Sequence, residues 1–495
     1  MPESGRLSDR ANALIDLAEG LVGQSVPTQL AELRERLSQP LNVVVTGTVS
    51  AGKSTLVNAL LGRAIAPTAG TENTEVVARI RAGARDEAEM VLRGSGERRK
   101  LALADSGMLP DKLPIPAAEV AELDVSVRGA DALLDEITLV DTPGFGGLAD
   151  HERRSADTAR EMERAGALIL VVAGKELERE LDTVWEFQRS DPGVNSAANT
   201  IGVRTQADLI RPAPGEDVWH AAERAARDLR RGYGGAVATV LPLAGLVAQT
   251  VSCDALEDHT VEGLRVLAQG DPEELRRALM ATEWFLDPQR ELGVSHEART
   301  ELNRLLHRKG IELAVTLLRE ADEPISAGGL RERLRVRSGF TELERAVGDI
   351  ASRAEAIKTR AVINELKKLS VGPLTGVPKE KLSALRHAVE QMEVSDPTLH
   401  DLRIVETLAA IDAGRVRLPE TLDSEARRFA RGGSVTERLC LASTAATEAR
   451  AAIERSSRRW SRFAAASGGA LPTHLRDELA RLMTTACSLM ALELP

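Results

Sequence analysis

The sequence contains few cysteines, few aromatic residues and no long apolar run. Its three cysteines, Cys253, Cys440 and Cys487, are widely spaced and odd in number, which argues against a disulfide framework or a zinc knuckle. Aromatic residues make up only 2% of the chain, so we expect no base-stacking platform for nucleic acid. Apolar runs such as 167–174 are far shorter than the roughly 20 residues that cross a bilayer. These absences predict a cytoplasmic protein, with peripheral membrane contact at most.

An excess of basic charge is also missing. The chain carries 64 lysines and arginines against 75 aspartates and glutamates, a formal net charge of -11, which argues against a protein that coats nucleic acid. The eight histidines show no metal-ligand spacing. At roughly 150 residues per domain, the 495 residues allow about three structural units, each with its own core. A folded enzyme is compatible with this composition.

Between residues 41 and about 250 the sequence alternates short β-branched runs with longer helical patterns. Such alternation is typical of parallel strands joined by crossover helices. The clearest strands are expected at 41–46, 136–141, 167–173, 199–204 and 236–242. Further strands are expected at 74–80, 88–93 and 122–128, with the basic segment 94–100 as a hairpin tip. The pattern predicts an α/β fold with a mostly parallel sheet.

After about residue 255 only helical patterns remain, so we expect an all-α carboxy-terminal part. Apolar residues at alternating steps of three and four form one stripe there: Phe340, Leu343, Val347, Ile350, Ala354, Ile357 and Ala361. Segments 7–21 and 475–489 carry the same spacing. We expect the three stripes to pack in one antiparallel bundle that joins both termini. The alternative is that each stripe covers a separate core face.

Residues 47–54 read GTVSAGKS and fit the pattern G-x-x-x-x-G-K-[ST], directly after an apolar strand and before a helix. The glycines let the backbone curl so that N–H groups face phosphate oxygens, and the helix amino terminus adds positive potential. Lys53 is expected to neutralise the β and γ phosphates of a nucleoside triphosphate, and the Ser54 hydroxyl to bind Mg²⁺. The segment therefore predicts a phosphate-binding loop.

A second motif, DTPG at 141–144, ends the strand expected at 136–141. Asp141 can hold Mg²⁺ through water, and Gly144 can offer its N–H to the γ-phosphate without a side chain in the way. Alone this motif would indicate a turn, but together with the phosphate loop it favours a nucleotide site. The polar segment 66–77 suits a cover for the bound triphosphate. Within it we assign Thr74 to Mg²⁺ and to orienting water, with Thr71 as second choice.

Recognition of the base is expected at TQAD, 205–208, after the strand at 199–204. Asp208 can accept two hydrogen bonds from guanine that adenine cannot donate. Gln206 stands where guanine-binding proteins usually carry a lysine, so ATP remains an alternative to GTP. In the loop after the strand at 236–242, Ala244 and Gly245 can bring a backbone N–H to the guanine carbonyl oxygen.

These motifs resemble those of the dynamin superfamily of large GTPases, and within it the short actinobacterial branch of isoniazid-inducible dynamin-like proteins. The resemblance covers most of the chain and is carried by residues 40–80, 139–152, 205–208, 240–246 and 338–366. It implies amino-terminal helices at 1–40 that join a helical bundle, a GTPase domain at 41–325 and a helical neck or stalk at 326–495. The implied nucleotide contacts are Gly47, Ser50, Ala51, Gly52, Lys53, Ser54, Thr55, Gly144, Thr205, Asp208, Ala244 and Gly245. The implied Mg²⁺ ligands are Ser54, Thr74 and Asp141, and the implied catalytic residues are Ser50, Lys53 and Thr74.

One departure bears on the rate of hydrolysis. Eukaryotic dynamins carry Gln-Ser before Ala-Gly-Lys, whereas this chain has Val49-Ser50, so we expect slow or partner-assisted hydrolysis. The main hypothesis is a Mg²⁺-dependent GTPase whose conformational and assembly cycle acts at the cytoplasmic membrane face. The resemblance implies a homodimer across the GTPase domains, or a heteromer with a longer dynamin-like protein. The alternatives are a GTP-dependent scaffold with negligible hydrolysis and a P-loop ATPase without a membrane role.

Overall fold

The computed structural model describes residues 6–67, 76–128, 133–144, 151–174, 177–191, 194–214, 216–371, 374, 377–413, 418–442, 445–465 and 471–494. Over these residues one sheet contains nine strands. They are β1 (Leu41–Gly47), β2 (Val77–Gly83), β3 (Glu87–Leu92), β4 (Arg98–Leu101), β5 (Val120–Arg128), β6 (Ile137–Asp141), β7 (Ala167–Val172), β8 (Thr200–Arg204) and β9 (Thr239–Pro242). All eight strands expected from the sequence are present.

The strand order is β4-β3-β5-β2-β6-β1-β7-β8-β9. Strands β6, β1, β7, β8 and β9 run parallel to one another, and β2 is parallel to β5. The pairs β2–β6, β3–β4 and β3–β5 are antiparallel. The α/β prediction with a mostly parallel sheet is confirmed. Because the parallel strands share one direction, the carboxyl ends of β6, β1, β7 and β8 meet at one edge of the sheet.

Strand β4 corrects the interpretation of 94–100 as a hairpin tip. Residues 98–101 pair antiparallel with β3, with Arg98 opposite Val91 and Leu101 opposite Ala88. Strand β4 lies at the edge of the sheet, where charged side chains are favoured because they discourage pairing with other chains. Apolar alternation is therefore weak in this strand, and the sequence pattern missed it.

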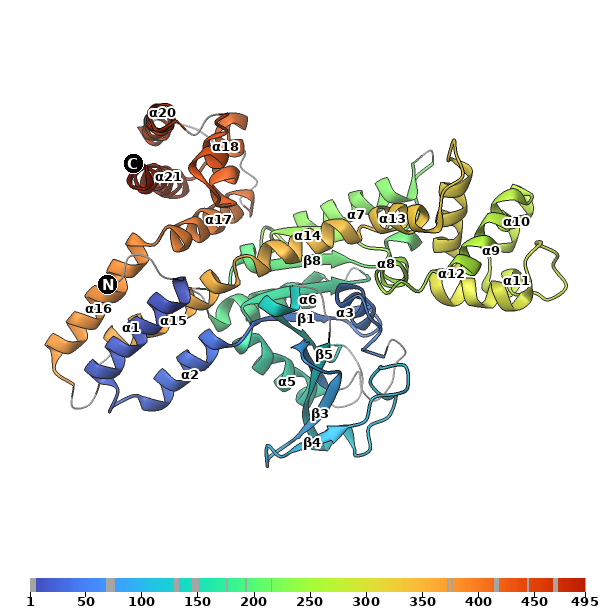
Figure 1. The fold of residues 1–495 in the computed structure, drawn as a ribbon, viewed down its shortest axis with the longest axis horizontal. Coiled ribbons are helices and arrows are strands. Elements are labelled where there is room, and N and C mark those ends of the chain that lie inside the picture. The colour runs from blue at the N-terminus through green and yellow to red at the C-terminus, as the bar shows by residue number, and fades with distance from the viewer. Residues whose placement is uncertain are drawn as a thin grey trace.

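Helices cover both faces of the sheet (Figure 1). One face packs against α5 (His151–Arg164), α6 (Leu177–Ser190) and α7 (Val218–Gly232), with Met162, Val184 and Phe187 buried against the strands. The other face packs against α3 (Lys53–Leu61), α14 (Phe340–Ala351) and α15 (Ala354–Val371). The short helix α4 (Leu133–Glu136) directly precedes β6.

A helical lobe extends from the sheet beyond the carboxyl end of β9 (Figure 1). Its helices are α8 (Gly245–Ser252), α9 (Asp258–Gln269), α10 (Pro272–Ala278), α11 (Thr282–Phe285), α12 (His296–Arg319) and α13 (Ala327–Arg337). They share a core of their own, to which α13 contributes Leu330 and Leu334. Helix α12 is kinked at His307, whose φ is +53°.

The remaining helices form two groups rather than one bundle. They are α1 (Leu7–Val22), α2 (Pro27–Ser38), α16 (Lys379–Ser395), α17 (Pro397–Ala413), α18 (Glu420–Ala430), α19 (Val435–Leu439), α20 (Ala446–Ala465) and α21 (Thr473–Glu493). Helix α1 packs on α2, α15 and α16, whereas α21 packs on α17, α18 and α20 (Figure 1). Helix α17 joins the groups, because Leu402 lies in the first core and Ile404 in the second.

The joint bundle expected of three stripes is therefore partly wrong. The stripes at 7–21 and 340–361 do share one core, which also confirms that amino- and carboxy-terminal segments pack together. The stripe at 475–489 belongs to the second core, through Leu479, Leu482 and Ala486. Apolar spacing shows which face of a helix is buried, but it carries no information on which helix covers that face.

Candidate active site

The phosphate loop connects the carboxyl end of β1 to the amino terminus of α3. Ser50 and Gly52, on either side of Ala51, adopt positive φ angles of +61° and +86°. This alternation turns successive backbone N–H groups toward one side and forms a concave site for an anion. The Ala51 N–H donates to the Thr48 carbonyl at 3.2 Å, which holds the loop in this shape. The sequence pattern and the backbone geometry thus agree on an anion-binding loop.

Lys53 is buried under this loop, with only 8% of the residue exposed. Its ammonium group donates to the carbonyls of Gly47 at 3.2 Å and Thr48 at 3.0 Å. Burial lowers the pKa of the Lys53 ammonium, and the nearby Asp141 carboxylate partly opposes this effect. Two carbonyl dipoles and one carboxylate are weak compensation for a buried cation, so the loop is prepared to receive negative charge.

Asp141 and Ser54 meet beside Lys53 because β6 pairs with β1. The Ser54 hydroxyl donates to Asp141 Oδ2 at 3.0 Å. The other carboxylate oxygen, Oδ1, is buried and has no hydrogen-bond partner in the described part of the chain. Burial raises the pKa of Asp141 to about 6, while Lys53 and the Ser54 hydroxyl act in the opposite direction. A hydroxyl and a carboxylate with a free oxygen are ligands of the kind that Mg²⁺ prefers in nucleotide sites, so these residues fit that ion.

Gly144 approaches the phosphate loop too closely for any other residue. A Cβ at this position would lie 2.8 Å from Lys53 Nζ and from Val49 Cα. The preceding Thr142 fixes this approach, because its N–H and its hydroxyl both donate to the Val45 carbonyl, at 3.2 and 3.0 Å. The DTPG segment is thereby attached to β1 with Gly144 against the loop.

Thr205 braces the phosphate loop from the opposite side. Its buried hydroxyl donates to the Ala51 carbonyl at 2.6 Å and also lies 3.2 Å from the Val172 carbonyl. The next residue, Gln206, is exposed and has a φ of +53°. Thr205 therefore acts in this structure as a positioning residue that links the end of β8 to the loop.

We expect Thr205→Val to weaken GTP binding, because it keeps the shape of the side chain but leaves the Ala51 carbonyl without its donor. The expected change is a rise in KM of about fivefold and a loss of about 1 kcal/mol in the free energy of unfolding. Thr200→Val is the matched control, since the buried Thr200 hydroxyl donates to the Ser196 carbonyl at 3.0 Å at the other end of β8. A similar rise in KM for both variants would contradict the bracing role.

The segment proposed to read the base contacts the helical lobe. The Ala207 N–H donates to the Leu243 carbonyl at 3.2 Å, which places the two predicted base-binding loops together. Burial raises the pKa of Asp208, while a backbone hydrogen bond and the nearby His307 and Lys309 of α12 partly oppose this. The sequence reasoning missed these α12 residues, because nothing in the local pattern connects positions a hundred residues apart.

The loop at 242–245 has two backbone N–H groups that could donate to the base, and one of them already donates to a carbonyl of the protein. The Ala244 N–H donates to the Ser338 carbonyl at 2.9 Å, between α13 and α14. Gly245 lies near Thr55, and a Cβ at Gly245 would be 3.6 Å from the Thr55 methyl carbon. As the first residue of α8, Gly245 has no intrahelical acceptor for its N–H, so it is the better donor of the two for a ligand.

The structure thus brings most of the predicted site residues to one edge of the sheet. Gly47, Ser50, Ala51, Gly52, Lys53, Ser54 and Thr55 form the loop and the first turn of α3, with Asp141, Gly144 and Thr205 against them. Thr74 and Thr71 lie outside the described residues. In the part of the chain that the structure describes, no group of three or more His, Cys, Asp or Glu side chains is placed to hold a metal ion.

A phosphate loop on β1, a carboxylate at the end of β6 and a bracing residue at the end of β8 define the class of P-loop nucleotide hydrolases. The comparisons with known proteins narrow this class. The dynamin family model matches residues 43–203. The isoniazid-induced protein IniC of two Mycobacterium tuberculosis strains is 30% identical over 453 residues, covering 88% of this chain and 87% of that protein. The chain belongs to the dynamin family, and it is a GTPase.

Two solved structures were also matched, both of an oligomerised bacterial dynamin pair that provides a mechanism for long-range sensing and tethering of membranes. Both are 14% identical to this chain. The TM-scores are 0.29 and 0.32, with 97% and 98% of this chain covered and 74% and 72% of the solved chains. The family assignment rests on the sequence matches and not on these structures.

Proposed function

We propose that the chain binds GTP with Mg²⁺ at the phosphate loop and hydrolyses it to drive a conformational and assembly cycle. The observation that carries this proposal is the buried Oδ1 of Asp141, which has no hydrogen-bond partner among the described residues, on the carboxylate that accepts from Ser54 and lies near the buried Lys53. An unbonded buried oxygen and a poorly compensated ammonium group both favour a ligand that carries a cation and an anion together. Mg²⁺ bound to a triphosphate is such a ligand.

Each residue then has a distinct task. Lys53 would exchange its two carbonyl acceptors for phosphate oxygens, and the N–H groups around Ser50 and Gly52 would surround the phosphates. The Gly144 N–H would contact the γ-phosphate. Ser54 and Asp141 would hold Mg²⁺, which supplies positive charge against the charge that develops on the phosphate oxygens. We propose Thr74 as the further Mg²⁺ ligand that also orients water. We also retain Ser50 as a proposed catalytic residue.

Steady-state phosphate release from GTP and ATP, with Mg²⁺ or with EDTA, tests this proposal. We expect kcat/KM for GTP to exceed that for ATP at least about tenfold, because Asp208 can pair with guanine but not with adenine. We expect chelation of Mg²⁺ to abolish release from GTP. Equal rates with ATP would remove the role of Asp208 and favour the ATPase alternative. Full activity in EDTA would remove the roles of Ser54 and Asp141.

One observation favours the second candidate, a GTP-dependent scaffold with slow hydrolysis. Val49 is 51% exposed beside Gly144, so an apolar side chain occupies the position from which a polar one could orient the attacking water. We expect Val49→Gln to raise kcat by about tenfold with little change in KM, since an amide can hold the water. Val49→Leu is the control and should leave kcat unchanged. No acceleration in single-turnover assays of Val49→Gln would show that water placement does not limit the rate.

The membrane and assembly parts of the proposal draw their support from family membership. We propose action at the cytoplasmic membrane face, as a homodimer across the GTPase domains or with a second dynamin-like protein. No helix within the described residues has the length and apolar character that a membrane span requires. Sedimentation with anionic vesicles and light scattering, each with and without GTP, test these parts. Failure to sediment in any nucleotide state would remove the membrane role.

We propose three units: amino-terminal helices at 1–40, a GTPase domain at 41–325 and a helical neck or stalk at 326–495. The last boundary falls just before α13, which packs on α8 and α12. The Ser338 carbonyl that follows α13 accepts from Ala244 in a proposed nucleotide loop. We infer that α13 is the connection through which a change at the nucleotide would reach α14 and the helices beyond it.

A further inference from the structure

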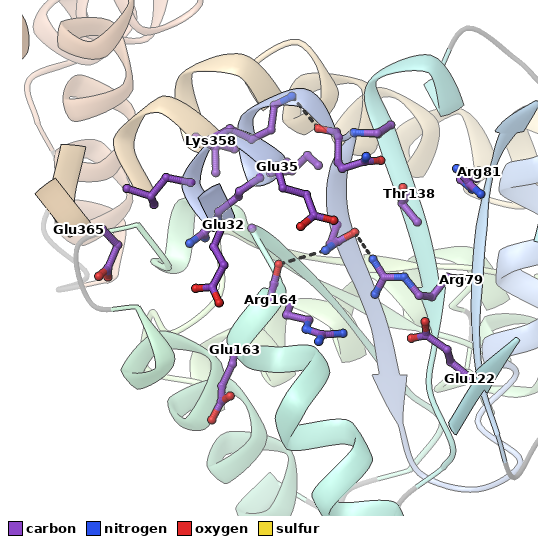
Figure 2. A pocket seen from close by; sticks show the side chains of 18 of the residues that line it. Glu32, Glu35, Arg79, Arg81, Glu122, Thr138, Glu163, Arg164, Lys358 and Glu365 are labelled. Atoms are coloured by element: carbon purple, nitrogen blue, oxygen red, sulfur yellow. Dashed lines mark hydrogen bonds between the residues drawn. The ribbon is translucent and has the colours of Figure 1, made fainter. Parts of the chain in front are cut away.

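A cleft of about 810 Å³ lies at the edge of the sheet opposite the phosphate loop (Figure 2). It is lined at the amino ends of β1 and β6 by Leu41, Asn42 and Thr138. Its walls come from α2, α15, the last turn of α5 and strands β2, β4 and β5. The volume is in the range of roughly 300–1,000 Å³ that small-molecule sites occupy. None of the residues assigned to GTP lines this cleft.

The floor of the cleft is a buried polar layer. Arg79 donates to Glu161 at 2.6 Å and to Asn42 Oδ1 at 2.7 Å, and Asn42 Nδ2 donates to the Arg164 carbonyl at 3.2 Å. Thr138, which is opposite Asn42 in the pairing of β6 with β1, is only 5% exposed. No hydrogen bond among the described residues uses its hydroxyl. Thr138 lines the cleft, so its hydroxyl is a group to which a ligand in the cleft can bond.

The basic side chains of the cleft are already engaged within the described part of the chain. Arg81 and Arg98 bond to Asp124, at 3.1 and 2.8 Å. Lys358 donates to the carbonyls of Leu37 and Gln39, at 3.0 and 2.8 Å. The other cations have acidic neighbours, since Arg36 is 3.6 Å from Asp191, Arg79 is 2.6 Å from Glu161 and Arg164 is 3.7 Å from Glu161. Arg79 and Arg164 share one carboxylate and Lys358 bonds only to uncharged carbonyls, so these contacts compensate the positive charge of the lining only in part.

Carboxylates remain without partners on opposite walls. Glu32 and Glu35 on α2 and Glu122 on β5 form no ion pair with any described residue, and Figure 2 shows them on either side of the cleft. Between them, Leu33, Leu41 and Ile357 give the lining an aliphatic part. No aromatic ring occurs among the described lining residues, which argues against an aromatic cage for a quaternary ammonium ion. Besides its bonded cations, the lining therefore offers carboxylates, of which Glu32 and Glu35 are exposed, together with aliphatic side chains and the Thr138 hydroxyl.

We propose that this cleft binds a linear aliphatic polyamine. Its ammonium groups would pair with Glu35 and Glu122 and donate to the Thr138 hydroxyl, and its methylene segments would lie on Leu33, Leu41 and Ile357. Ammonium groups can pair with the carboxylates while the methylene chains between them contact the aliphatic side chains. A metal ion would leave the aliphatic side chains without a contact. Because the cleft lies between α2 and α15 on one side and the sheet on the other, the bound polycation would connect the two and stabilise the folded chain by mass action.

Isothermal titration calorimetry of the full chain with spermidine, at physiological ionic strength, tests this inference. We expect saturable binding, weaker binding of the shorter diamine putrescine, and at least about tenfold lower spermidine affinity for Glu35→Gln/Glu122→Gln. Glu342→Gln/Glu448→Gln is the matched control, because it makes the same charge change at exposed positions outside the cleft. The control should bind spermidine as the parent does. Thr138→Val, a conservative change in a strand, should weaken binding about threefold.

Three results would overturn the inference. Equal affinity of the cleft and control variants would mean that spermidine senses only the net negative charge of the protein. Displacement of spermidine by MgCl₂ at matched ionic strength would indicate a diffuse counterion atmosphere. Binding of a lysine-rich peptide in the cleft without binding of spermidine would indicate a protein partner instead. Lys53→Ala should keep the spermidine affinity of the parent, so a failure of this inference is separate from a failure of the GTPase proposal.

Discussion

Lys53→Ala is expected to lower kcat for GTP at least about 100-fold, because the loop loses the ammonium group proposed to contact the phosphates. Without nucleotide, the same variant should be as stable as the parent or slightly more stable. Burial lowers the pKa of the Lys53 ammonium, and its acceptors are two carbonyls, so the charge is costly to keep buried before phosphate arrives. Phosphate release and thermal unfolding with and without GTP measure both effects.

The controls separate catalysis from folding. Lys53→Arg should also be inactive, since a longer planar guanidinium does not fit a site in which the residue is 8% exposed. Lys379→Ala removes an exposed lysine at the start of α16 and should leave hydrolysis unchanged. Parent-like hydrolysis by Lys53→Ala would exclude the proposed catalytic role. A large drop in the unfolding temperature of nucleotide-free Lys53→Ala would mean that Lys53 supports the fold instead.

Asp141→Asn is expected to abolish Mg²⁺-dependent hydrolysis while stabilising the nucleotide-free chain. Burial raises the pKa of Asp141 to about 6, above its value in the unfolded chain. At neutral pH the ionised carboxylate therefore lowers the free energy of unfolding, and a neutral asparagine removes this cost. The raised pKa already includes the opposing attraction to Lys53, so at about 1.36 kcal/mol per pKa unit a gain of up to roughly 3 kcal/mol is expected. Thermal unfolding in EDTA at neutral pH measures this gain.

Stability and activity should therefore move in opposite directions at this residue, as is common for sites built for function. Asp111→Asn is the control, because Asp111 is exposed and distant in the chain from the strand end. It should change neither the unfolding temperature nor hydrolysis. Loss of stability in Asp141→Asn would show that the carboxylate supports the fold through its bond with Ser54, and retained hydrolysis would exclude it as a ligand of Mg²⁺.

The strands and the phosphate loop could be predicted because their signals are local. A buried parallel strand appears in the sequence as a short β-branched run. The pattern that ends in Gly52-Lys53-Ser54, directly after such a run, is typical of a phosphate-binding loop. Strand β4 was not predicted from the sequence, because Arg98 and Arg99 lie at the edge of the sheet. Charged side chains are solvated there, so an edge strand needs no apolar pattern. The prediction of Thr74 for Mg²⁺ remains a prediction.

Contacts between distant segments could not be predicted from patterns. The stripe at 475–489 marked a buried helix face, but nothing in its spacing indicates that α17, α18 and α20 cover this face instead of α1. Likewise, no spacing rule connects Asp208 with His307 and Lys309, or Ala244 with Ser338. These pairs come together only because α8 to α13 fold as a lobe beside the sheet.

The sequence by itself determined the expected ligand chemistry, since the proposed contacts come from the backbone of a loop between a strand and a helix and from the carboxylate of Asp141 at a strand end. It determined the α/β class for the same reason, because periodicity reports which faces are buried. Only the tertiary structure decided which helices share a core, what braces the loop, and that a polar cleft with Glu35 and Glu122 on opposite walls lies at the far edge of the sheet. Those features depend on which buried faces meet, and side-chain spacing along one segment cannot encode its partner.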